Sequence, residues 1–131
     1  MPEPSRSGTL TPLVVVDAAN VVGSVPDGWW RDRPGAARRL RDRLAAAVAQ
    51  GRVAGVDTPL ELVLVVEGAA RGVEPVAGVR VLAASGSGDD AIVSLVAAEG
   101  RGRDVVVVTA DRELRARVAA EGAATVGPRG L

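Results

Sequence analysis

Three short, almost uninterrupted apolar runs constrain the fold of this chain more than any other feature. They are LVVV at 13–16, LVLVV at 62–66 and VVVV at 105–108. A strand that is covered on both faces has no polar side, so it reads as a continuous apolar run rather than as an alternating one. Two weaker runs, at 79–83 and 123–126, bring the number of predicted strands to about five. The runs therefore predict a sheet that is buried on both sides.

Segments with helical spacing separate these runs. Apolar residues recur every three or four positions over 37–48 and 92–97, and a third such segment runs from about 112 to 121. Strands that alternate with helices predict an α/β, Rossmann-like domain with a parallel sheet and helices on both faces. A chain of 131 residues can bury one such core. We expect a flexible tail over 1–11 and a single domain over 12–131.

The connection between the first predicted strand and its helix, residues 18–33, is longer than such loops usually are. We expect it to form a loop, and it contains the only two aromatic residues of the chain, Trp29 and Trp30. No apolar run is long enough to cross a membrane, and the first residues lack the apolar centre of a signal peptide. We therefore expect a soluble, cytoplasmic protein with no membrane partner.

The composition excludes several kinds of chemistry. The chain has no cysteine and no histidine, and all 16 basic residues are arginine. Disulfides, thiolate metal sites, imidazole bases and phosphate-binding lysines are therefore absent. Carboxylate, amide, hydroxyl and guanidinium groups remain. A metal site built from these groups has only oxygen ligands, which favours Mg²⁺ or Mn²⁺ over Zn²⁺.

Acidic residues follow the predicted strands at the point where each strand ends. Asp17 and Glu67 come directly after the first two apolar runs, and Asp111 follows the VVVV run closely. The helix after the glycine-rich corner SGSG begins with Asp89 and Asp90. The carboxyl ends of parallel strands form one edge of the sheet, where ligands usually bind. Clustered carboxylates repel one another unless a cation neutralises them, so the pattern favours a metal site.

Each of these acids also has a structural explanation. Asp111 is placed to cap its helix, Asp90 lies three residues after Ser87 as in a capping box, Asp89 suits the positive end of a helix dipole, and Asp17 suits an Asx-turn. Helix capping does not explain acids at several strand ends at once. The metal interpretation is weakest for the strand-end glutamate, which is equally suited to bonding a neighbouring loop.

Three segments of the chain together resemble the NYN family of PIN-like nucleases: VVVDAAN at 14–20, SGSGDDAIVSLVAA at 85–98 and VVVVTADREL at 105–114. The resemblance spans about residues 12–127. It implies that the first and fourth strands lie side by side and that Mg²⁺ or Mn²⁺ supports RNA hydrolysis. The residues that match the family's site positions are Asp17, Asn20, Asp89, Asp90 and Asp111.

Two positions depart from the family pattern. Many relatives carry a further acid in the first long helix, where this chain offers only Asp42, and we expect that residue to lie on the surface near Arg38 as an i,i+4 pair. Glu67 stands where some relatives carry Asp after the second strand. It is therefore a candidate fourth metal ligand beside Asp17, Asp89, Asp90 and Asp111.

The resulting prediction is a metal-dependent endoribonuclease that acts on single-stranded or structured RNA, with Asn20 orienting a carboxylate or the attacking water. Arg31 and Arg33 are expected to contact phosphates, and Trp29 and Trp30 to stack on bases. A tryptophan used as a core or homodimer anchor is equally compatible with the sequence. The alternatives are a noncatalytic RNA-binding or partner-binding module of the same fold, and a nucleotide phosphohydrolase.

Overall fold

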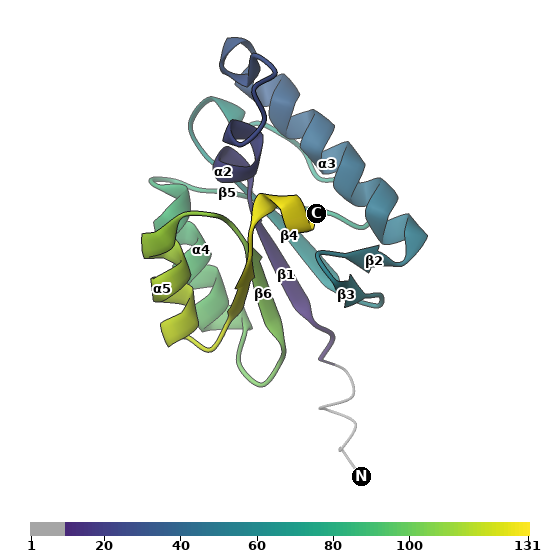
Figure 1. The fold of residues 1–131 in the computed structure, drawn as a ribbon, viewed down its shortest axis with the longest axis vertical. Coiled ribbons are helices and arrows are strands. Elements are labelled where there is room, and N and C mark those ends of the chain that lie inside the picture. The colour runs from purple at the N-terminus through teal and green to yellow at the C-terminus, as the bar shows by residue number, and fades with distance from the viewer. Residues whose placement is uncertain (1–9) are drawn as a thin grey trace.

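The computed structural model describes residues 10–131 and shows a parallel sheet between two layers of helices (Figure 1). The five strands lie in the order β5-β4-β1-β6-β7. Their bounds are β1 (Leu13–Asp17), β4 (Glu61–Val66), β5 (Arg80–Ala83), β6 (Val105–Val108) and β7 (Ala124–Val126). The α/β class is confirmed, and each predicted strand end differs from the observed one by at most one residue. Positions 1–9 of the predicted tail lie outside the described residues.

Four α-helices and two 3₁₀ turns lie between the strands of the sheet, and a third 3₁₀ turn follows β7. The helices are α2 (Ala18–Gly23), α3 (Arg33–Gln50), α4 (Gly88–Glu99) and α5 (Arg112–Ala120). The turns are η1 (Trp29–Arg31), η2 (Gly68–Ala70) and η3 (Pro128–Gly130), and a small hairpin of β2 (Arg52–Val53) and β3 (Val56–Asp57) follows α3. No helix among residues 10–131 is both long enough and apolar enough to span a bilayer.

The prediction of a loop over 18–33 is wrong in part, because α2 and η1 occupy most of that segment. Two acids explain the difference. Asp17 caps α2 by accepting from the backbone nitrogen of Asn20, and Asp32 caps α3 by accepting from that of Gly35. Each cap satisfies a backbone donor that a helix start leaves unpaired, so the chain can begin a helix directly after β1.

Both faces of the sheet are buried, which explains the continuous apolar runs. Towards α2 and α3, the core contains Val14, Val16, Leu62 and Leu64 of the sheet and Leu40 and Leu44 of α3. Towards α4 and α5, it contains Leu13, Val15, Val63 and Val65 of the sheet and Ile92, Leu114 and Val118 of the helices. Full burial of each such side chain contributes about 1.5–3 kcal/mol. The core therefore fixes the register of the central strands.

Alternation along the strands decides where the residues after them point. The odd-numbered apolar residues of β1, β4 and β6 belong to the core beneath α4 and α5. Because successive side chains alternate between faces, the next odd positions, Asp17, Glu67 and Thr109, continue the same rows. The three polar side chains therefore lie on the α4–α5 side, where both helices begin.

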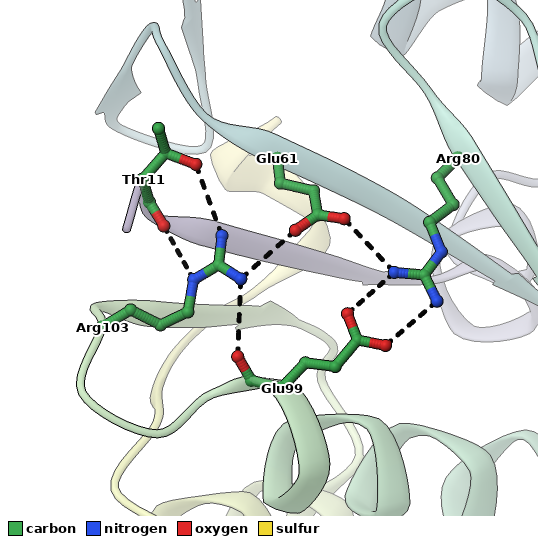
Figure 2. Close-up of polar contacts among 5 residues, drawn as sticks. All are labelled: Thr11, Glu61, Arg80, Glu99 and Arg103. Atoms are coloured by element: carbon green, nitrogen blue, oxygen red, sulfur yellow. Dashed lines mark hydrogen bonds and ion pairs between the residues drawn. The ribbon is translucent and has the colours of Figure 1, made fainter. Parts of the chain in front are cut away.

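The opposite, amino-terminal edge of the sheet is closed by a polar network (Figure 2). Arg103, just before β6, donates to the Thr11 carbonyl at 2.7 Å and to Glu61 at 3.2 Å. Arg80, the first residue of β5, donates to Glu61 at 3.2 Å and to Glu99 at 2.8 Å. The Arg80 guanidinium holds the pKa of Glu99 below its usual value. Two arginines and two glutamates thus connect the starts of four adjacent strands with no excess charge.

Replacing Arg103 by alanine should destabilise the fold. Its side chain is only 10% exposed, and its loss leaves Glu61 and the Thr11 carbonyl without their charged donor, at a cost of about 2–3 kcal/mol. Chemical denaturation would measure the change. Arg101→Ala is the matched control, because Arg101 is an exposed neighbour whose loss should change stability by about 0.5 kcal/mol or less. Equal stability of the two variants would contradict this role of the network.

Candidate active site

Five predicted acids come to one edge of the sheet, and we call Asp17, Glu67, Asp89, Asp90 and Asp111 the acidic edge. Asp17 is the last residue of β1, and Glu67 directly follows β4. Asp89 and Asp90 lie in the first turn of α4, and Asp111 is the N-cap of α5. β1 lies between β4 and β6. Because β6 is the fourth strand of this sheet along the chain, the predicted pairing of the first and fourth strands is confirmed.

Asp17 is the most buried member of the acidic edge, with 6% of its surface exposed. One carboxylate oxygen accepts from the Thr109 hydroxyl at 3.0 Å, and the other accepts from the Asn20 backbone nitrogen at 3.4 Å. No basic side chain among residues 10–131 forms an ion pair with it. Burial is the main reason why the pKa of Asp17 is raised, and the charges of Asp89 and Glu67 add to that effect.

Thr109 was missed by the sequence reasoning, although it lies at the centre of the site. Its fully buried hydroxyl donates to Asp17 and accepts from the Asp111 backbone nitrogen at 3.1 Å. The strand register pairs Val16 with Val108, so Asp17 and Thr109 are the next residues on each strand. A threonine that directly follows a fully apolar parallel strand was the available signal.

Asn20 contacts a different group from the one predicted. Its side-chain oxygen accepts from the backbone nitrogen of Ala110 at 2.9 Å. The side chain therefore connects α2 to the loop that carries Asp111, and its contribution to Asp17 comes through the backbone nitrogen. Asn20 is a positioning residue in this structure.

The structural explanations of the acids at the helix starts are also present. Asp111 accepts from the Leu114 backbone nitrogen at 3.0 Å, which makes it a capping residue. Asp90 is 73% exposed and forms an ion pair with Arg117 at 3.0 Å. The pKa of Asp89 is raised, first by burial and then by the charges of Asp111 and Glu67. Asp17 and Asp89 are therefore the two acids of the edge whose charged forms are disfavoured by burial.

Glu67 contacts the start of α4. One of its carboxylate oxygens accepts from the backbone nitrogen of Gly88. A Cβ atom at position 88 would lie 2.5 Å from that oxygen, which is closer than such atoms approach. Glycine at this position therefore permits Glu67, 21 residues earlier in the chain, to accept from the first nitrogen of α4, beside the Ser87 N-cap.

The acids share an edge but do not gather around one point. Within residues 10–131, no three acidic side chains lie close enough together to hold a single ion. The expectation of a fully convergent cluster is wrong for the side chains as they stand. Helix caps and the Arg117 ion pair occupy several carboxylates, and like charges favour separation. The donor set itself consists of oxygen atoms only, which is the chemistry that Mg²⁺ and Mn²⁺ prefer.

The four predicted substrate-binding residues form one patch, which we call the aromatic patch: Trp29, Trp30, Arg31 and Arg33. The two indole rings meet edge to face with 6.0 Å between centroids. Arg31 lies 5.8 Å from the ring centre of Trp30, and Arg33 lies 5.4 Å from that of Trp29. Trp30 is 53% exposed, so it is not a core anchor. The patch offers planar and cationic surfaces together.

The acid in the first long helix is a surface residue, as predicted. Asp42 is exposed, but it pairs with Arg41 at 3.0 Å and not with Arg38. Arg41 also donates to the Glu74 carbonyl at 2.9 Å, which holds its side chain towards Asp42. Asp42 therefore belongs to the outer surface of α3 and not to the acidic edge.

The chain is therefore an α/β domain with a five-stranded parallel sheet and a carboxylate-rich edge at the carboxyl ends of its strands. No protein-family model matches the chain, and no curated protein matches it. Among solved structures, the crystal structure of a mutant of Rae1 (YacP) from Bacillus subtilis is similar to it, with a TM-score of 0.68 and 17% sequence identity. The match covers 92% of this chain and 72% of that one. It establishes the fold, and the resemblance to the NYN family stays a prediction.

The contact between Glu67 and Gly88 should appear as an energetic coupling. Gly88→Ala displaces the Glu67 carboxylate, so the substitution should be less favourable in the wild type than in the Glu67→Ala background, by about 1–2 kcal/mol. Denaturation of the four members of this double-mutant cycle measures the difference. Gly86→Ala is the control, because a Cβ atom there meets open space. An equal effect of Gly88→Ala in both backgrounds would show that the contact carries no free energy.

Burial of Asp17 should also appear in the pH dependence of stability without metal. The pKa of this acid is higher in the folded state than in the unfolded state, so the folded protein binds the proton more tightly. The free energy of unfolding then falls as pH rises from the ordinary aspartate range through the folded pKa. Asp17→Asn removes this fall.

Denaturation of both proteins in EDTA at a series of pH values provides the measurement. Loss of a hydrogen bond in Asp17→Asn would shift its free energy of unfolding by the same amount at every pH. Loss of the titrating carboxyl group would instead make the slope of that free energy against pH less negative. Asp89→Asn should change the slope in the same direction, because the pKa of Asp89 is also raised. Parallel curves for wild type and Asp17→Asn would contradict the assignment.

Proposed function

We propose that this chain is a metal-dependent endoribonuclease that hydrolyses RNA phosphodiester bonds at the acidic edge. The main support is the buried Asp17 carboxylate, which lies near further acids and has no ion-pair partner within residues 10–131. Buried charges in proteins are ordinarily paired or bound to a metal. A cation at this edge would offset the charges that raise the pKa values of Asp17 and Asp89.

Asp17, Asp89 and Asp111 are the side chains that would hold Mg²⁺ or Mn²⁺, and they would approach one another to do so, because no three acidic side chains of residues 10–131 surround one point in this structure. When bound, the ion supplies positive charge that activates water and offsets the charge that develops on the phosphate. Glu67 and Asp90 are already engaged with Gly88 and Arg117, so they support the edge from its sides. This division of the acids refines the larger ligand set that the sequence suggests.

The other residues of the site position these groups. The Thr109 hydroxyl holds the Asp17 carboxylate and the backbone of Asp111 in one arrangement. Asn20 fixes the loop between them by binding the Ala110 nitrogen. The guanidinium group of Arg31 binds a phosphate of the strand, which compensates for part of the negative charge of the acidic edge. The exposed Trp30 ring stacks on a base, a contact worth about 1–3 kcal/mol.

The proposal is tested by incubating purified protein with labelled RNA and DNA, with and without Mn²⁺. We expect metal-dependent cleavage of RNA and a loss of about 100-fold or more in Asp17→Asn. Asp42→Asn is the matched control, since it removes an exposed acid on α3 and should retain activity. Mn²⁺ at about 100 times its Kd should also stabilise the wild type by about 2.7 kcal/mol, and Asp17→Asn much less.

The outcomes separate the proposed activity from its alternatives. Undiminished cleavage by Asp17→Asn would overturn the assignment of the site. RNA binding without any metal-dependent product would favour the noncatalytic module of the same fold. Hydrolysis of free nucleotides with RNA left intact would favour the phosphohydrolase.

A further inference from the structure

A small cavity lies beside the acidic edge, between α2, the start of α3 and η2. Its volume is about 180 Å³. Ligand sites for drug-sized molecules measure roughly 300 to 1,000 Å³, so this cavity suits one small planar group. Small apolar side chains leave the space, and larger polar or aromatic ones border it: Ala19, Ala37, Ala70, Trp29, Arg33 and Glu67.

The aromatic and cationic walls of the cavity suit a nucleobase. Trp29 and Arg33 both line it, and the guanidinium carbon of Arg33 lies 5.4 Å from the centre of the Trp29 ring. Indole and guanidinium groups are the planar surfaces on which proteins stack unpaired bases. A base in a single-stranded RNA can turn away from its neighbours to enter such a site, whereas a base within a duplex must first unpair and unstack.

Glu67 is the acidic residue of the cavity lining, and it gives the cavity a preference for bases that donate hydrogen bonds. The bond from the Gly88 nitrogen to one of its oxygens holds its side chain between the cavity and the start of α4. An ionised carboxylate only accepts hydrogen bonds, so it favours a base edge with adjacent donors. Among the four RNA bases, guanine presents two donors side by side, the ring N1–H and the exocyclic amino group. Its O6 acceptor complements the donors of Arg33.

We propose that this cavity binds a guanine base of single-stranded RNA next to the bond that is cleaved. The inference rests on the proposed function and adds a base preference to it. Glu67 joins the two sites, because it lines the cavity, follows the strand whose Val65 pairs with Asp17, and accepts from Gly88, the residue before Asp89. A guanine held by Glu67 therefore leaves its own phosphates close to the acids.

The chain contains its own reporter for this cavity, since Trp29 and Trp30 are its only aromatic residues. In Trp30→Phe, all indole fluorescence comes from the cavity wall. Short uridine oligomers that carry one central guanosine, adenosine or cytidine, and the unsubstituted oligomer, are titrated in EDTA, where metal-dependent cleavage does not occur. We expect the guanosine oligomer to quench Trp29 and to bind about tenfold or more tightly than the others.

Two variants of this single-tryptophan protein test the geometry. Ala19→Leu fills the cavity from an exposed position of α2, where leucine is a good helix former, and it should abolish the quenching. Glu67→Gln keeps an oxygen for the Gly88 nitrogen but replaces one acceptor by a donor, so it should remove the guanosine preference. Ala98→Leu is the matched control, because it adds the same side chain at an exposed position of α4 away from the cavity.

Equal binding of all four oligomers, or unchanged quenching in Ala19→Leu, would overturn the guanine site. Retention of the guanosine preference in folded Glu67→Gln would also overturn it, even if Ala19→Leu failed to fold. Because binding is measured without metal, the two proposals fail separately. Mn²⁺-dependent RNA cleavage without guanosine preference removes only the guanine site. Guanosine-selective binding with no cleavage supports the guanine site and removes the nuclease activity.

Discussion

The hydrogen bond between Thr109 and Asp17 is the contact on which the rest of the acidic edge depends. It joins the ends of the two central strands, and the same hydroxyl accepts from the first backbone nitrogen that leads into α5. Without this donor, a carboxylate that is 6% exposed would keep only one weak backbone contact at 3.4 Å. One buried hydroxyl thus connects the Asp17 carboxylate to the backbone of Asp111, the residue that caps α5.

The two ends of the sheet differ in how their charges are satisfied. At the amino-terminal edge, every charged group of the network has a partner of opposite sign, and the arginines connect four strands (Figure 2). At the carboxyl-terminal edge, Asp17 and Asp89 carry charges that burial makes unfavourable. Ion pairs thus stabilise one end of the strands, while the other end presents acids whose charges burial disfavours. Such a division suits a binding site on a rigid scaffold.

Much of the fold could be predicted because its strands are short, apolar and buried on both faces, a pattern that is visible in a single sequence. The location of the acids followed from the same runs, since each acid comes directly after a strand or opens a helix. Helix α2 was missed because its residues, AANVVG, give less than two turns of periodicity. Its existence depends on the Asp17 cap, and the sequence also allowed that acid to form an Asx-turn.

The finer geometry of the site depends on contacts between distant positions, which one sequence does not record. Asn20 binds a nitrogen 90 residues away, and Thr109 bonds Asp17 across 92 residues. Whether several acids surround one point depends on rotamers, and these follow local competition between helix caps, ion pairs and repulsion. The residue types predicted the kind of site, whereas the partners of each side chain required the structure.

The approach of Glu67 to Gly88 has a consequence for how this sequence can diverge. A glutamate at position 67 disfavours a side chain at position 88, because a Cβ atom there would displace the glutamate's carboxylate oxygen. A shorter residue at 67 would lift that restriction and leave the first nitrogen of α4 in need of another acceptor. In homologous chains, the two positions should therefore change together. Glycine at position 88 should accompany a residue at position 67 that is long enough to accept from its backbone nitrogen.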